Sequence, residues 1–235
     1  MKKGNLYLVP SSLGSEHPTD FVPPAVHEVV NRVNHFVVED EKTARRFLRS
    51  IGMKRPFEEL SMNALNEHTS LENLLSLLQP ALKGEDIALM SDAGCPAVAD
   101  PGSELVKFAH ENKVRVIPLP GPSSILLSLM ASGLNGQSFA FTGYLPKDRS
   151  DRIKKLKHLE NYAITSGQSQ LFMDTPYRNM NVLEDILANM RPTTSLCIAS
   201  NINCPNEFIR TKTIGDWKEQ LPALEKKPCI FVLGK

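Results

Sequence analysis

Short apolar runs rich in β-branched residues alternate with helix-like segments along most of this 235-residue chain. The runs that predict strands lie at residues 6–9, 36–38, 87–90, 114–117, 139–142, 170–173, 196–199 and 230–233. Apolar side chains at helical spacing separate several of them, at residues 41–51, 71–82 and 180–190. This alternation predicts an α/β protein whose strands are mostly parallel.

The segment at residues 118–122 is the best candidate for a domain boundary. It contains three prolines and a glycine, which stiffen the chain. We therefore predict one α/β domain at residues 1–119 and a second at residues 120–235. An alternating run at residues 207–214 follows the strand at 196–199 after a short loop. Such a short connection indicates antiparallel pairing in the second half.

Composition and charge narrow the class of protein. With 41% hydrophobic and 23% charged residues, the chain is globular and long enough for two cores. The formal net charge is +1, so nucleic acid or another polyanion would need a local basic patch. The N-terminus has no signal-peptide pattern, and no run approaches the roughly 20 apolar residues of a membrane span. We expect a cytoplasmic protein with no membrane partner.

The four cysteines do not predict a metal site. Cys95, Cys197, Cys204 and Cys229 form no C-x-x-C pair and have no histidine at zinc-ligand spacing. Small buried thiols are the favoured interpretation. Cys95 is the exception, because it lies inside a loop rich in glycine and proline.

Two loops carry the functional signal. The strand at residues 87–90 leads into S-D-A-G-C-P-A-V-A-D-P-G, residues 91–102, and the strand at 114–117 leads into P-L-P-G-P-S-S, residues 118–124. Parallel strands would place both loops at the carboxyl edge of one sheet, where α/β proteins bind ligands. Taken alone, the first loop fits a ligand site or a tight turn equally well. No G-x-G-x-x-G follows residues 6–9, and no Walker motif occurs.

The two loops, together with motifs along the rest of the chain, resemble the tetrapyrrole methylase family. The supporting motifs are V-V-E-D at 37–40, F-T-G-Y-L-P at 141–146, D-T-P-Y-R at 174–178 and K-P-C-I-F-V-L-G at 227–234. Within the family they are most similar to the branch of bacterial small-subunit rRNA ribose-2′-O-methyltransferases. The resemblance covers essentially all of the chain.

The resemblance implies two α/β domains of the tetrapyrrole methylase type with a cofactor cleft between them. It further implies a homodimeric methyltransferase that binds S-adenosylmethionine mainly through its backbone. The residues that match the family's cofactor positions are Pro10, Gly94, Cys95, Pro96, Val98, Pro120, Gly121, Ser123, Ser124 and Met173. The resemblance also implies that Pro10, at the end of the first strand, borders the acceptor trough.

Charge in the first loop suits this cofactor. Asp92 and Asp100 flank a segment without lysine or arginine, which favours the sulfonium cation over a phosphate. Both aspartates could instead cap loop or helix backbone.

The acceptor side is less well defined. Candidate catalytic residues are Glu39, Asp40, Tyr144 and Arg178, although Glu39 and Asp40 could simply cap the helix near residue 41. The rRNA branch typically has E-D-T-R where this chain has E-D-E-K at 39–42, and Y-H-E-H-N where this chain has M-N-A-L-N at 62–66. It also carries a helical extension after the final strand, which we expect to be missing here.

Three functions therefore remain open. The first is methylation of RNA, with rRNA ribose as the expected acceptor, and the basic cluster between Lys147 and Lys157 would meet the phosphate backbone. That cluster could equally be the solvated face of a helix at 150–159. The second is methylation of a tetrapyrrole or another small molecule. The third is a non-catalytic module that binds S-adenosylmethionine.

Overall fold

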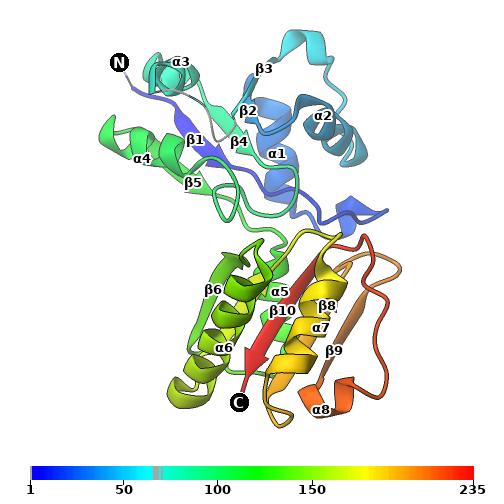
Figure 1. Ribbon diagram of the computed structural model, residues 1–235. Coiled ribbons are helices and arrows are strands. Elements are labelled where there is room, and N and C mark those ends of the chain that lie inside the picture. Colours follow the sequence, from blue (N-terminus) through cyan, green and yellow to red (C-terminus); the bar gives the residue numbers. More distant parts are fainter. Residues whose placement is uncertain (1, 66–68, 70) are drawn as a thin grey trace. The chain divides into compact units, whose positions relative to one another are not determined.

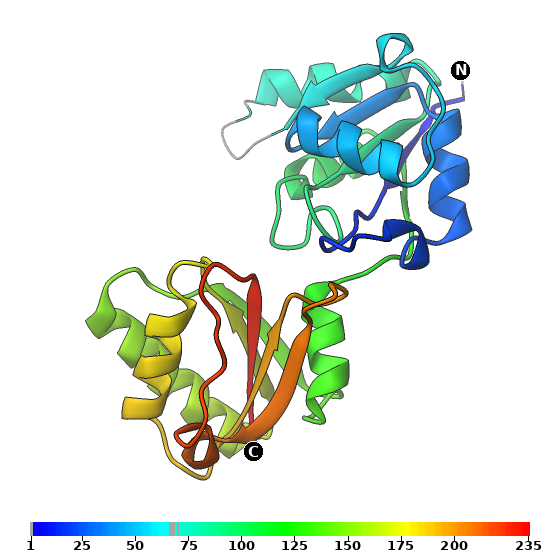
Figure 2. The same ribbon diagram turned by 90° about the vertical axis from the view of Figure 1, so that its right-hand side faces the viewer.

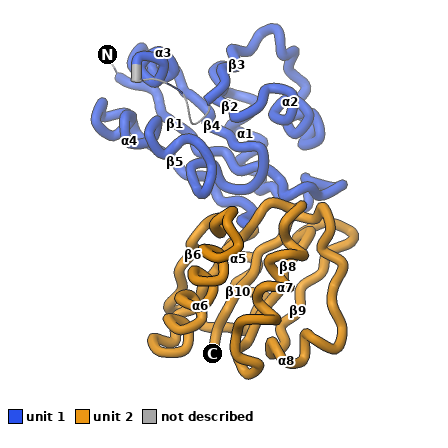
Figure 3. The backbone as a smooth tube through the Cα atoms, viewed as in Figure 1, with its two compact units in different colours: residues 1–123 blue, residues 124–235 orange. Residues whose placement is uncertain are grey.

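The computed structural model describes residues 2–65, 69 and 71–235 (Figure 1). The chain divides into two compact units, Met1–Ser123 and Ser124–Lys235, which Figure 3 colours separately. The division thus falls after Ser123, whereas the sequence prediction puts it after residue 119. Asn66, the last residue of the 62–66 segment compared with the rRNA branch, lies outside the described residues.

Unit 1 is built on a five-stranded sheet in the order β3-β2-β4-β1-β5. Every pairing in it is parallel, as the alternating sequence predicts. Its strands are β1 (Asn5–Leu8), β2 (His35–Val38), β3 (Ser61–Ala64), β4 (Ile87–Met90) and β5 (Arg115–Pro118). The loops after β4 and β5 therefore leave the same edge of the sheet, on either side of β1, which pairs with both strands.

Helices cover both faces of this sheet. They are α1 (Pro24–Arg32), α2 (Glu41–Ser50), α3 (Leu71–Leu82) and α4 (Ser103–Glu111), with short 3₁₀ turns at Pro18–Asp20 and Phe57–Glu59. Alternate strand residues point to opposite faces. Phe36 and Met90 thus join the apolar cluster that contains α1 and α2 residues, while Val37 and Leu89 join the one that contains α3 and α4 residues. Each such fully buried side chain stabilises the fold by about 1.5–3 kcal/mol.

Unit 2 has a mixed sheet in the order β6-β7-β10-β8-β9. Its strands are β6 (Phe139–Tyr144), β7 (Ser169–Met173), β8 (Ser195–Ser200), β9 (Phe208–Thr213) and β10 (Cys229–Gly234). Only β6 and β7 pair in parallel, while the last strand, β10, lies antiparallel between β7 and β8. The predicted antiparallel pairing in the second half is confirmed by β8 and β9.

The helices of unit 2 also lie on both faces of its sheet. They are α5 (Ser124–Ser132), α6 (Arg149–Ser166), α7 (Asn179–Asn189) and α8 (Ile214–Trp217). Figure 2 shows the green α5 on one face and the yellow α7 on the other. Trp217 is buried beside α6 and α7 residues, and its indole N–H donates to the Leu196 carbonyl (2.9 Å). None of the described helices is long and apolar enough to cross a membrane.

Candidate functional site

Backbone hydrogen bonds fasten the 91–102 loop to the segment after β1. The Ser11 N–H donates to the Gly94 carbonyl (2.8 Å), and the Gly94 N–H donates to the Ser11 carbonyl (3.1 Å). The buried Ser11 hydroxyl also donates to the Ser91 carbonyl (2.8 Å). Because three hydrogen bonds join the two segments, the start of the loop has a fixed position against the end of β1.

The second loop packs against the same segment. A Cβ atom added to Gly121 would lie 2.2 Å from the ring carbon Cγ of Pro10, so only glycine fits there without a shift of the backbone. The Cys95 thiol donates to the Pro122 carbonyl (3.5 Å). The two predicted cofactor loops are therefore neighbours within unit 1, with Pro10 against one of them.

The first loop follows an unusual backbone path. Ala97 and Ala99 have φ values of 65° and 63°, in the left-handed region that residues other than glycine rarely adopt. Gly102 has a φ of 130°, and a Cβ atom there would lie 2.8 Å from a methyl carbon of Leu89. Backbone strain of this kind persists only where the surroundings hold it, and it concentrates at ligand-binding sites.

The predicted cofactor residues differ in exposure. Pro96 is buried, whereas the Val98 side chain is exposed on the loop. Burial raises the pKa of the half-buried Cys95 thiol, so this group is a neutral hydrogen-bond donor at neutral pH. Ser123 ends unit 1, and Ser124 begins α5.

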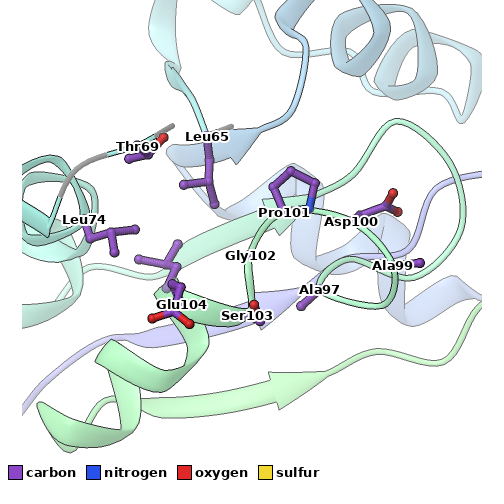
Figure 4. Close-up of a pocket in the computed structure, with 11 residues that line it drawn as sticks. Leu65, Thr69, Leu74, Ala97, Ala99, Asp100, Pro101, Gly102, Ser103 and Glu104 are labelled. Carbon is purple, nitrogen blue, oxygen red and sulfur yellow. The ribbon is translucent and has the colours of Figure 1, made fainter. Parts of the chain in front are cut away.

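A cavity of about 480 Å³ lies between this loop and the start of α3, and we call it the leucine cavity (Figure 4). Leu65, Leu74 and Leu105 supply its apolar walls, and the first residues of α4 supply polar groups. Its volume is within the range of small-molecule pockets. In Figure 4 the carboxyl group of Asp100 lies on the far side of Pro101 from the leucines.

Four acidic side chains gather at the carboxyl ends of β2 and β4, and we call them the carboxylate cluster: Glu39, Asp40, Asp92 and Asp100. Burial raises the pKa of Asp100 to about 6, and the negative charge of Glu39 adds to this effect. The pKa of Asp92 is also raised, first by burial and then by Glu39. A cation bound among these groups would relieve their mutual repulsion.

Glu39 and Asp40 have different partners. One oxygen of Glu39, Oε2, accepts a hydrogen bond from the Asp92 N–H (3.2 Å), which links β2 to the first loop. Asp40 is the N-cap of α2, and its Oδ1 accepts from the Thr43 N–H (2.8 Å). This hydrogen bond lowers the pKa of Asp40. The capping role, one of two interpretations of the sequence, thus applies to Asp40.

The other predicted site residues lie together in unit 2. Tyr144 ends β6 and is the register partner of Met173, which ends β7. Arg178 precedes α7 and forms an ion pair with the buried Asp174. Asp174 Oδ2 and Arg178 Nη1 are buried and have no hydrogen-bond partner among the described residues. All three predicted residues are therefore at, or just beyond, the carboxyl end of the parallel strand pair.

The basic cluster of α6 is smaller than the sequence indicates. Arg149 and Arg152 both bind the buried Asp185 of α7, at 2.9 and 2.7 Å. Lys154 pairs with Asp151 (3.1 Å). Two arginines of the cluster thus hold α6 to α7, which leaves few charges for a phosphate backbone.

Sequence reasoning missed a second cavity, of about 400 Å³, which we call the arginine cavity. It lies in unit 1 between α2 and the segment after β1, and Asp92 and Ala93 of the first loop reach it. Arg46 is the basic residue in its wall. Four residues of one α2 face line it, Thr43, Arg46, Phe47 and Ser50, but such spacing does not by itself indicate a cavity.

Across the described ranges, no group of three or more His, Cys, Asp or Glu side chains is arranged to hold a metal ion.

Comparison with known proteins identifies the family. Residues 6–218 match the family model of tetrapyrrole (corrin/porphyrin) methylases. The chain belongs to this family. It is therefore a methyltransferase, and a methyltransferase requires a methyl donor. For the tetrapyrrole methylase described here, the strand-end loops of unit 1 are the natural candidates for that donor's site.

Relatives with assigned names are also methyltransferases. The methylase is 30% identical to the ribosomal RNA small subunit methyltransferase I of Escherichia coli O157:H7 over 214 residues, which is 91% of this chain and 71% of that one. It is 31% identical to the protein of the same name from Haemophilus influenzae, over 93% of this chain and 73% of that one. The crystal structure of the methyltransferase CobJ shares the fold, with a TM-score of 0.65 and 19% identity over 99% of this chain and 94% of that one.

Proposed function

We propose that this methylase transfers a methyl group from S-adenosylmethionine to a ribose hydroxyl of ribosomal RNA. The observation that carries the proposal is the pair of adjoining glycine- and proline-rich loops in unit 1, beside the carboxylate cluster. The choice of acceptor is supported by the relatives that are named ribosomal RNA methyltransferases.

The first loop fits a cationic methyl donor. It carries Asp92 and Asp100 but no lysine or arginine between residues 91 and 102, so the sulfonium meets carboxylates and no competing cation from the loop. Its left-handed residues and glycines leave backbone groups open to a ligand. The residues that we expect to hold the donor are Pro10, Asp92, Gly94, Cys95, Pro96, Val98, Gly121, Ser123, Ser124 and Met173.

The bound donor supplies an activated methyl group on a positively charged sulfur. The protein's task is then to hold the acceptor oxygen in line with that methyl carbon, and positioning alone contributes about 7–11 kcal/mol. A hydroxyl acceptor also gains from a general base. Glu39 suits this role better than Asp40, because the capping hydrogen bond from Thr43 lowers the pKa of Asp40 and so makes it a weaker base. Tyr144 and Arg178 remain proposed acceptor-side residues.

Family membership also leads us to expect a homodimer, which sedimentation velocity would test. An acceptor in ribosomal RNA would place the protein in the cytoplasm.

Transfer of labelled methyl groups tests the proposal. Purified protein is incubated with labelled S-adenosylmethionine and small ribosomal subunits from cells that lack the protein, and the modified nucleotide is mapped by mass spectrometry. We expect one ribose methylation per subunit. Transfer to a uroporphyrinogen but not to subunits would favour a small-molecule acceptor. Tight donor binding without any product in subunits or cell extract would favour a non-catalytic module.

A matched pair of variants tests the general base. At saturating S-adenosylmethionine, Glu39→Gln should lower kcat by about 10²–10⁴-fold, because the amide cannot take the proton. Glu41→Gln is the control, since Glu41 lies two residues away and pairs with Arg45 on α2. Equal activity of the two variants would remove Glu39 from the mechanism.

A further inference from the structure

The arginine cavity has a mixed polar lining that suits a nucleotide. One wall is a face of α2 with Thr43, Arg46, Phe47 and Ser50, and the other is the segment after β1, from Ser12 to Glu16. Its volume of about 400 Å³ is at the scale of pockets that hold one small ligand. The cavity also reaches Asp92, so it adjoins the predicted donor loop.

Arg46 differs from the other two arginines of α2. Arg45 pairs with Glu41 (3.2 Å) and lies over the Phe57 ring. Arg49 also lies over Phe57 and donates to the Met53 carbonyl (2.8 Å). Arg46 is exposed, and no carboxylate in the described parts of the chain forms an ion pair with it. Two arginines thus stabilise the fold around α2, and the third, Arg46, lines the cavity.

Hydroxyl groups of the opposite wall can assist an anion. The Ser15 oxygen accepts from the His17 N–H (3.0 Å), which leaves the Ser15 hydroxyl proton free to donate. Within the described residues, the Ser12 hydroxyl has no hydrogen-bond partner. A guanidinium and two hydroxyls are the donors that commonly contact phosphate oxygens in nucleic-acid complexes.

The two carboxylates of the lining restrict the kind of anion. Glu16 and Asp92 would repel a multiply charged anion such as a polycarboxylate. A phosphodiester carries a single negative charge, and the adjoining ribose offers hydroxyl donors that carboxylates accept. The single guanidinium therefore suits one phosphodiester group better than the several carboxylates of a porphyrinoid.

We propose that the arginine cavity binds a nucleotide of the RNA acceptor and that Arg46 holds its phosphodiester group. This proposal rests on RNA as the acceptor of the methylase. It gives a role in substrate binding to Arg46, for which no sequence motif predicts a function. It does not alter the proposed donor site.

The test compares Arg46→Ala with Arg45→Gln, a loss of the same charge at the next position of the same helix. Binding of both variants to small-subunit ribosomal RNA is measured by fluorescence anisotropy over a range of salt concentrations, with saturating S-adenosylmethionine. We expect Arg46→Ala to weaken binding about tenfold or more and to reduce the salt dependence by about one phosphate contact. Arg45→Gln should change neither quantity. Arg46→Lys should keep the salt dependence and lose part of the affinity.

Circular dichroism and S-adenosylmethionine affinity provide the fold and donor-site controls. Equal RNA affinity and salt dependence for Arg46→Ala and Arg45→Gln would overturn the proposal. An Arg46-dependent binding of a uroporphyrinogen, with no effect on RNA, would also overturn it. If the unmodified protein neither binds nor methylates RNA, the proposed function itself fails. If it does both and Arg46→Ala changes neither, only the role of Arg46 fails.

Discussion

Replacement of Asp100 by asparagine should stabilise unit 1 at neutral pH. Asp100 lies in the 91–102 loop, where burial and the charge of Glu39 raise its pKa to about 6, partly offset by a hydrogen bond from Ser91. Asparagine has nearly the same shape and can keep a hydrogen bond to Ser91. The substitution therefore removes the ionised form, which the fold disfavours, with little loss of packing.

The size of this stabilisation follows from the pKa shift of Asp100. A rise from 3.8 to about 6 is roughly two pKa units, and at about 1.4 kcal/mol per unit the upper limit is about 3 kcal/mol. Because the carboxyl group is only half-buried, water screens the interaction, and we expect about 1 kcal/mol. An aspartate with a raised pKa favours the fold below its unfolded pKa, and this contribution is lost as the pH rises through the folded pKa. The gain from Asp100→Asn should thus be complete above about pH 6 and absent near pH 4.

Urea unfolding at about pH 4 and about pH 8 measures this difference. Circular dichroism follows both units, while the single tryptophan, Trp217, reports on unit 2 alone. Asp100→Asn should shift the unfolding transition of unit 1, which circular dichroism detects and tryptophan fluorescence does not. A variant that is less stable than the unmodified protein at about pH 8, or a difference that is the same at both pH values, would refute the electrostatic reasoning.

Two further substitutions probe the loops and the α6–α7 contact. Gly121→Ala should weaken S-adenosylmethionine binding, measured by calorimetric titration, at least tenfold, because the new methyl group would lie 2.2 Å from Pro10. Gly136→Ala is the control: its methyl group meets no atom within 4 Å, so the affinity should not change. Asp185→Ala should destabilise unit 2 by about 3–5 kcal/mol, since it leaves the buried Arg152 without its counter-charge. Urea unfolding followed by tryptophan fluorescence checks the second value, and a loss below about 1 kcal/mol would contradict it.

Much of the fold could be predicted because several of its strands are buried on both faces. Such strands appear as apolar runs, for example Ile87–Met90, in which every residue is buried. Ser61–Ala64 was missed because this edge strand is mostly exposed and polar. The place of β10 between β7 and β8 was also not predictable, because long-range pairing leaves no mark on the composition of a single run.

The site shows the same division between local and long-range information. The two loops that we propose as the donor site were predictable as neighbouring strand-end loops, because glycine and proline at strand ends constrain the backbone locally. The significance of Arg46 was not, since it depends on which neighbouring arginines find partners in the folded protein. The ion pairs of Arg149 and Arg152 were not predictable for the same reason, because their partner Asp185 lies far along the chain.

The most direct test of the central claim is calorimetric titration of the protein with S-adenosylmethionine and with S-adenosylhomocysteine. The two ligands share their amino and carboxyl groups, but only the first carries the sulfonium charge. We predict saturable binding of S-adenosylmethionine. This binding should weaken as the pH falls below about 6, where Asp100 becomes neutral, and S-adenosylhomocysteine binding should weaken less. Failure of both ligands to bind, or an identical pH dependence for the two, would contradict a donor site beside the carboxylate cluster.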